Sequence, residues 1–196
     1  MASARAFAEK GANKVKGFVS IIQHKEPLEF IPYGDGDPTH GYFRIPESVM
    51  SERHMKNMIV NQASVFMAKR MRPGTSWGSG IGYLEIGTGV GSGSTQSPEP
   101  EDPAQTGLRE PLVRKAITSW TCLDENGDPT AEDTNVLQFT TTFTEEEAVG
   151  ALVEMGLFGG DADENIGTGM MFNYKVFPVI NKDESMQLTI VWKVTF

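Results

Sequence analysis

The residues with the clearest capacity for chemistry lie in the stretch IGYLEIGTGVGSGST, which covers residues 81–95. A hydrophobic run carrying Glu85 is followed there by glycines at positions 87, 89, 91 and 93. Because glycine lets a backbone come close to a phosphate or a nucleoside, this order is typical of a cofactor-binding turn. It is equally typical of a glycine-rich loop that leaves a strand beside another backbone. The residues that follow must distinguish the two.

The glycine stretch resembles the first motif of nucleotide-dependent methyltransferases, in which a helix starts directly after the glycines. Here Gly93 is followed by STQSPEPEDPAQTG, whose prolines at 98, 100 and 103 prevent an uninterrupted helix. The dinucleotide spacing G-x-G-x-x-G fails because Ser92 stands at the third glycine position, and no lysine follows to make a phosphate loop. We therefore expect no cofactor and predict a long exposed loop over residues 87–107. An S-adenosylmethionine-dependent methyltransferase is the remote alternative.

Two acidic turns have the spacing with which a calcium-binding loop begins. They are Asp124, Asn126 and Asp128, and Asp161, Asp163 and Asn165. Neither has the glycine that such a loop needs at its sixth position, nor the glutamate at its twelfth, where Asn135 and Phe172 stand. The histidines at 24, 40 and 54 lack ligand spacing. We predict no metal site and interpret the acids as turn residues, with a weak structural cation as the alternative.

The remaining reactive side chains also have simple structural interpretations. Cys122 is the single cysteine, so an intrachain disulfide is excluded. It lies in an apolar run before a turn, where a packed thiol fits better than a nucleophile. The run EEEA at 145–148 has the composition of a carboxylate cluster, but we interpret it as a polar corner between strands. No catalytic residue is predicted, and the protein is expected not to be an enzyme.

Charge and composition exclude some partners. The net charge of -9 and the pI of 4.8 argue against a surface that neutralises nucleic-acid phosphates. No apolar run reaches the length of about eighteen residues that spans a bilayer, so no membrane partner is expected. The many glycines and prolines predict frequent turns and a β-rich fold, and the length suits one core plus an appended arm.

The elements that must position these residues are mostly strands. One amphipathic helix is predicted over residues 46–71, where Met55, Ile59, Phe66 and others recur at steps of three and four. Strands are predicted at 81–86, 112–123, 136–143, 150–160, 167–177 and 186–196, with an Asn126-Gly127 hairpin turn. We predict a mainly β fold, an antiparallel β-sandwich or flattened barrel. The domains are an extended N-terminal arm over 1–45 and a helix-plus-sandwich domain over 46–196.

From Met58 onward the chain resembles a recurring kind of small structural protein of tailed bacteriophages. The matching pieces are IVNQASVFMA before the glycine stretch, then REPLVRKAIT, VLQFTTTFTEEEAVGALVEMGLF and MMFNYKVFPVINKDESMQLTIVWKVTF. In that group a helix precedes a strand that ends in a Gly-Thr-Gly turn, and the chain closes in strands ending in a Thr-Phe pair. The acidic character of the loop at 94–107 and the extension over 1–45 depart from the pattern.

This resemblance implies a non-enzymatic virion protein, associated with the tail or a fibre or present as a minor component, and assembled in the host cytoplasm. We expect an adaptor on the tail, neck or fibre-attachment side that binds other virion proteins and forms a homo-oligomer in the particle. A capsid decoration protein is the alternative. A carbohydrate-binding sandwich that uses Trp77, Trp120 and Tyr42 is a further hypothesis.

The predicted interface lies on the arm over 1–45, on the loop over 87–107 and on the acidic turns, because extended arms, exposed strand edges and aromatic hairpins suit binding to neighbours. A basic arm on an acidic protein is suited to an acidic partner. The candidate interface residues are Arg5, Lys10, Lys14, Lys16, Phe18, Phe30, Tyr33, Trp77, Glu99, Glu101 and Asp102.

Overall fold

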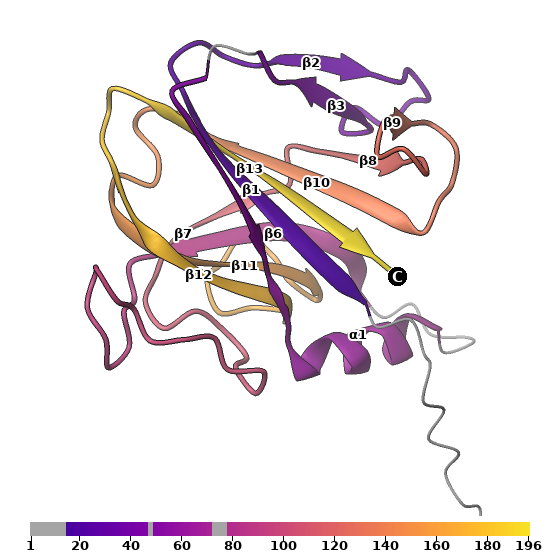
Figure 1. Cartoon of the computed structure of the whole chain (residues 1–196). Helices are drawn as coiled ribbons and strands as arrows, with labels where there is room; N and C mark the ends of the chain where they lie inside the picture. Colours follow the sequence, from indigo (N-terminus) through magenta and orange to yellow (C-terminus); the bar gives the residue numbers. More distant parts are fainter. Residues whose placement is uncertain (1–14, 47–48, 72–77) are drawn as a thin grey trace, which may run out of the picture.

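Two antiparallel sheets pack face to face in the computed structural model of the chain, which describes residues 15–46, 49–71 and 78–196 (Figure 1). The six-stranded sheet has the order β4-β1-β13-β10-β8-β9, and the five-stranded sheet has the order β5-β12-β11-β6-β7. A separate hairpin pairs β2 with β3. Within the described residues the sheets do not close into a barrel, so the predicted mainly β fold is confirmed as a sandwich.

The strands of the six-stranded sheet are β4 (Ser51–Lys56), β1 (Lys16–His24), β13 (Gln187–Thr195), β10 (Val136–Phe143), β8 (Ser119–Leu123) and β9 (Pro129–Thr130). Those of the five-stranded sheet are β5 (Met58–Ile59), β12 (Met170–Lys182), β11 (Gly150–Gly160), β6 (Ser79–Gly87) and β7 (Pro111–Ala116). The hairpin consists of β2 (Glu29–Pro32) and β3 (Gly41–Arg44).

The main hydrophobic core lies between the sheets and draws side chains from both. Ile21, Phe139 and Trp192 come from the six-stranded sheet, and Leu157 and Phe172 come from the other. These residues follow the period of two that points alternate side chains of a strand to one face. The alternation predicted for residues 136–143 and 186–196 is therefore observed in β10 and β13, where Phe143, Ile190 and Trp192 have no exposed surface.

The predicted helix over 46–71 is wrong in its first half. The helix α1 is Asn61–Met71, whereas Ser51–Lys56 is the edge strand β4 and Met58–Ile59 is β5. Exposure in β4 alternates with a period of two, so Met55 faces inward on a strand instead of joining a helical stripe. In the second half, Ala63 and Phe66 of α1 are buried in the main core, and both belong to the apolar stripe that was predicted.

The predicted N-terminal arm needs a correction at its C-terminal part. Residues 16–24 form β1, which lies between β4 and β13 and places Val19 and Ile21 in the core. Burial of these two side chains explains why this segment joins the sheet. Residues 1–14 lie outside the described part of the chain. The hairpin β2–β3 is a two-stranded unit, consistent with Pro32 excluding this segment from a central position.

The glycine loop, residues 88–110, connects the antiparallel neighbours β6 and β7 and contains neither helix nor strand. The predicted long loop is therefore present, and Gly93 leads to turns instead of a helix. The predicted hairpin turn at Asn126-Gly127 joins β8 and β9, with Gly127 at a φ of 86°. That φ lies in the left-handed region that glycine adopts without steric cost.

Candidate functional site

The glycine loop is held to the sandwich by one buried carboxylate, that of Glu154 on β11, which has no exposed surface. Its Oε1 accepts hydrogen bonds from the backbone N–H of Gly89 at 3.2 Å and of Glu110 at 2.7 Å. Its Oε2 accepts from the N–H of Arg109 at 3.0 Å and from the Tyr174 hydroxyl at 2.5 Å. Both ends of the loop are therefore tied to the same side chain.

The glycines of the loop are required by close packing inside the molecule. A Cβ at Gly89 would lie 2.4 Å from Oε1 of Glu154, and one at Gly93 would lie 2.2 Å from the carbonyl oxygen of Ser97. Gly91 has a φ of 62°, which disfavours other residues. The interpretation of these glycines as a loop packed against a neighbouring backbone is confirmed.

Burial and the Glu154 carboxylate together raise the pKa of Tyr174, since both disfavour a second negative charge at this position. The Tyr174 hydroxyl also accepts a hydrogen bond from Arg109 at 3.1 Å. The remaining donors of Arg109 bind the carbonyl oxygens of Glu99 at 2.9 Å and Pro100 at 2.7 Å. Arg109 thus connects the anchor at Glu154 to the far part of the loop.

The acidic residues predicted as an interface are bonded to other groups of the chain, either in the loop or on β12. Glu101 accepts hydrogen bonds from Lys175 and from the N–H of Val176, the latter at 3.1 Å. Burial alone would raise the pKa of Glu101, but these bonds outweigh it and hold the pKa below its usual value. Glu99 accepts from the N–H of Ser92 at 2.9 Å. Asp102 is exposed and accepts from the N–H of Ala104 at 2.8 Å.

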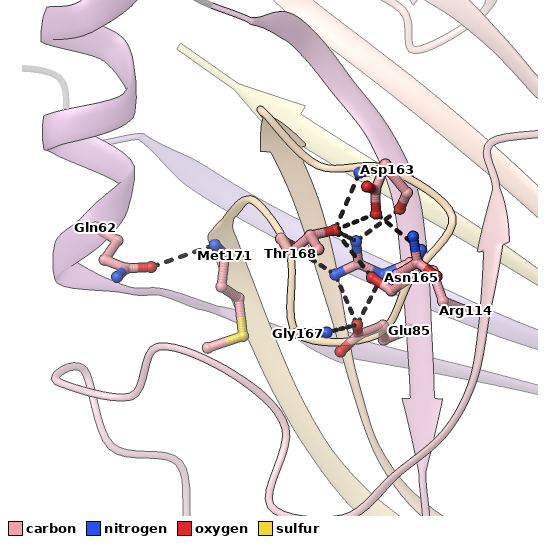
Figure 2. A network of polar contacts seen from close by, with 8 residues as sticks. All are labelled: Gln62, Glu85, Arg114, Asp163, Asn165, Gly167, Thr168 and Met171. Carbon is pink, nitrogen blue, oxygen red and sulfur yellow. Dashed lines mark hydrogen bonds and ion pairs between the residues drawn. The ribbon is translucent and has the colours of Figure 1, made fainter.

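A second polar network holds the connection between β11 and β12, residues 161–169 (Figure 2). Arg114 of β7 and Glu85 of β6 form a buried ion pair, with Nη2 of Arg114 2.6 Å from Oε1 of Glu85. The same guanidinium donates to the carbonyl oxygens of Asp163 and Thr168, each at 2.8 Å. It also lies 4.7 Å from the ring centre of Phe158. Glu85, the acid of the glycine stretch, therefore serves as a partner for Arg114.

The two calcium-like turns use their acidic side chains to stabilise the turns themselves. Asp163 accepts from the Thr168 hydroxyl at 2.7 Å and from the N–H of Asn165 at 2.9 Å. These bonds lower the pKa of Asp163. Asp124 accepts from the N–H groups of Asn126 at 2.9 Å and Asp128 at 2.8 Å. Among the described residues, no three His, Cys, Asp or Glu side chains form a group suited to a metal ion.

The aromatic residues of the hairpin pack on the chain's own sheet. The Tyr33 hydroxyl is 2.9 Å from Oγ1 of Thr121, and Phe30 lies against Phe43 with ring centres 5.1 Å apart. Trp120 stacks on His40 at 4.0 Å and donates from Nε1 to Asp37 at 3.2 Å. The ring faces that a carbohydrate-binding site would offer are therefore partly used within the fold. Trp77 lies outside the described residues.

The other candidates with reactive side chains are built into the structure. Cys122 is buried in β8, as predicted for a packed thiol. Glu147 of the acidic corner forms an ion pair with Lys115, and Glu145 accepts from Gln187 at 3.0 Å. Lys182 is buried beside that corner and donates to the carbonyl oxygens of Thr144 and Glu145 at 2.8 and 2.9 Å. Burial lowers the pKa of Lys182.

The clearest exposed feature with binding capacity is the outer face of the six-stranded sheet, the side turned away from the five-stranded sheet. A hollow of about 450 Å³ on this face is lined by Phe18, Ser20, Ile45, His54, Gln138, Val191 and Lys193. Phe18 is 43% exposed and Ile45 is 39% exposed. Apolar side chains that remain in water beside the Lys193 ammonium group suit a protein surface with apolar and acidic groups.

The predicted interface residues do not form one patch. Lys16 and Phe18 lie on β1, Phe30 and Tyr33 lie on or next to the hairpin, and the acidic residues lie on the glycine loop. The hairpin and the glycine loop are at opposite sides of the sandwich (Figure 1). Arg5, Lys10 and Lys14 lie outside the described residues, so this part of the interface remains a prediction.

Comparison with known proteins leaves the family of the chain open. No protein-family model matches the sequence, and no curated protein matches it. Among the described residues, no helix has the length and apolarity needed to cross a membrane.

Several residues that organise the site were missed in the sequence. They are Glu154, Arg109, Tyr174 and Arg114. A weak signal exists for Glu154, because it is a single charge within the apolar strand GALVEMGLF. A charge in such a strand must find partners when buried. Its partners are 20 to 65 residues away in sequence, so periodicity could not identify them.

Proposed function

We propose that the protein is a non-enzymatic structural component of a tailed-phage virion that binds neighbouring virion proteins. The observation that carries the proposal is the outer face of the six-stranded sheet. Phe18, Ile45 and Val191 line its hollow with Lys193 and His54, which gives a surface fit for protein contact instead of a deep pocket. We place it on the tail, neck or fibre-attachment side as an adaptor, assembled in the host cytoplasm.

The internal packing of the glycine loop supports the non-enzymatic part of the proposal. Glu154, Glu85 and Arg114 would be the natural candidates for acid-base chemistry because they are buried and charged. Each of them is bonded to several groups of the chain itself. Buried charges with such partners serve to hold loops in place.

The outer face is tested by incorporation into particles. Phe18→Ser, introduced into the phage that encodes the chain, is expected to lower the number of copies per purified particle, measured by quantitative mass spectrometry. Val65→Ser is the matched control, since Val65 is 49% exposed on α1. Both variants lose a similarly exposed apolar side chain, so both should fold. Wild-type incorporation of Phe18→Ser would remove the outer face from the proposal.

Copy number separates the adaptor from the capsid decoration protein. An adaptor is present in tens of copies or fewer, because the tail has few positions, whereas a decoration protein covers the many subunits of a capsid. Calorimetry with S-adenosylmethionine tests the methyltransferase alternative on the same preparation. Micromolar binding that is lost in Gly89→Asp would overturn the non-enzymatic assignment.

A further inference from the structure

Among the strands that the structure describes, β4 is a free edge of the six-stranded sheet, because β1 is its one neighbour there (Figure 1). The N–H of Asn57 donates to the carbonyl oxygen of Gly17 at 3.2 Å, which marks these two as a hydrogen-bonded pair. Such pairs alternate along an antiparallel ladder. The backbone groups of Glu52, His54 and Lys56 therefore point away from β1. No hydrogen bond connects them to another described residue.

The side chains of these three residues make the edge complementary to itself. Glu52, His54 and Lys56 are exposed on the outer face, next to Ile22, Ser20 and Phe18 of β1. A second β4 that runs antiparallel, with the two His54 residues opposite each other, places each Glu52 opposite Lys56 of the second copy. Opposite charges facing each other across two strands stabilise their pairing. In this alignment the outward-pointing backbone N–H and C=O groups of Glu52, His54 and Lys56 also face those of the second copy.

Two other symmetric registers of this edge place like charges opposite each other. A register centred on Glu52 pairs two glutamates, and one centred on Lys56 pairs two lysines. Lysine at a free edge commonly prevents association. Here each lysine lies opposite the glutamate of the second copy, so the charges favour the register centred on His54 over these two. Registers centred on Arg53 or Met55 form no pair between Glu52 and Lys56. Arg53 faces inward and donates to the carbonyl oxygen of Pro178 at 2.8 Å, which fixes the inner side of the strand.

We propose that two copies of this chain associate through antiparallel pairing of their β4 strands, centred on His54. The two six-stranded sheets become one continuous sheet, and the interface is two-fold symmetric, as in most homodimers. The inference rests on the proposed function and deepens it by naming a second copy as one partner. It concerns the backbone edge of β4, whose His54 and Met55 also line the hollow at Phe18. Its readout is self-association in solution and does not depend on particles.

Charge reversal on the purified full chain tests the pairing. Glu52→Lys and Lys56→Glu each place like charges at both ion-pair positions, so each should raise the dimer dissociation constant about tenfold or more in sedimentation analysis. The double variant restores the pairs in swapped order and should dimerise like the wild type. A mixture of the two single variants should form a heterodimer. One chain then carries two lysines at these positions and the other carries two glutamates, so every facing pair has opposite charges.

Exposed positions outside β4 provide the controls. Glu125→Lys and Lys25→Glu make the same changes in net charge and should leave dimerisation unchanged. Circular dichroism checks that every variant folds. A monomeric wild type, an unaffected single variant, or failure of the mixed variants to associate would each overturn the pairing. Wild-type incorporation of Phe18→Ser with dimerisation intact would remove the outer face from the proposed function and leave this inference standing. A monomeric wild type, together with reduced incorporation of Phe18→Ser, would overturn this inference and leave the proposed function standing.

Discussion

Replacing Glu154 by glutamine removes one charge and one acceptor from the anchor of the glycine loop while it preserves shape. In the wild type the carboxylate accepts three backbone N–H groups and the Tyr174 hydroxyl. Glutamine keeps a single oxygen, which can take the place of Oε1 and accept from Gly89 and Glu110. Its NH2 group then faces the two donors that Oε2 bound, the N–H of Arg109 and the Tyr174 hydroxyl. The Tyr174 hydroxyl can rotate to accept from that NH2 group. The N–H of Arg109 cannot rotate and loses its acceptor.

The loss of these bonds sets the expected change in the free energy of unfolding. A buried donor without an acceptor costs about 1–3 kcal/mol, and a bond to a charged acceptor exceeds a neutral one by about 1 kcal/mol. The lower desolvation cost of a neutral amide offsets part of this loss. We expect Glu154→Gln to lower the free energy of unfolding by about 3 kcal/mol. That is a large fraction of the stability of a domain, about 5–15 kcal/mol.

Urea unfolding followed by circular dichroism measures the change, and amide hydrogen exchange locates it. The N–H groups of Gly89, Arg109 and Glu110 should lose protection before those of the central strand β13. Glu164→Gln, the same change at an exposed residue, should stay within about 0.5 kcal/mol of the wild type. Unchanged stability together with full protection of the three amides would refute the role given to Glu154.

Three further predictions concern the networks and the loop. Arg114→Met leaves the buried Glu85 unpaired and should cost about 3–5 kcal/mol in urea unfolding, whereas Arg44→Met at an exposed pair should cost less than about 1 kcal/mol. The lowered pKa of Glu101 contributes stability that is present above 4.5, its value when unfolded, and is lost as the pH falls below that value toward the folded pKa. Lys175→Met should therefore flatten the fall in stability measured between about pH 5 and about pH 3, and an equally steep fall would contradict this cause. Gly93→Ala should lower the melting temperature, since its Cβ would lie 2.2 Å from the Ser97 carbonyl oxygen, while Gly107→Ala meets no atom within 4 Å and should be neutral or slightly stabilising. Equal melting temperatures for the two alanine variants would contradict the close packing.

Local sequence patterns were sufficient to predict the strands that lie between two neighbouring strands and bury one face. In β10 and β13 the side chains alternate over eight or nine residues, so Phe139 and Trp192 could be placed in the core from the sequence. The Asn126-Gly127 turn was also predictable, because its left-handed glycine has a strong local preference. These features depend on residues that are close in sequence.

The misplaced helix start has a similar local cause. Met55, Ile59 and Phe66 fit a helical stripe, but the six residues of β4 fit a strand equally well, and short segments carry too little pattern to decide. The choice of a strand over a helix for these residues is determined by pairing of β4 with β1, which lies well before β4 in the sequence. The same limit applies to Glu154 and Arg114, whose partners lie on other strands and on loops far away in the sequence. Sequence patterns show that such charges need partners, and the fold determines which partners they have.

The attachment of both loop ends to Glu154 has a consequence for engineering. Because the N–H groups of Gly89 and Arg109 both bond to Glu154, the distance between the two ends of this segment does not depend on the residues between them. Each doubling of a flexible loop costs only about 0.6 kcal/mol in closure entropy. Foreign peptides inserted near Thr95 and Gln96, in the exposed turn of this segment, should therefore be displayed without disturbing the strands. The chain would then serve as a scaffold for peptide presentation, in which the Glu154 side chain holds both ends of the inserted segment.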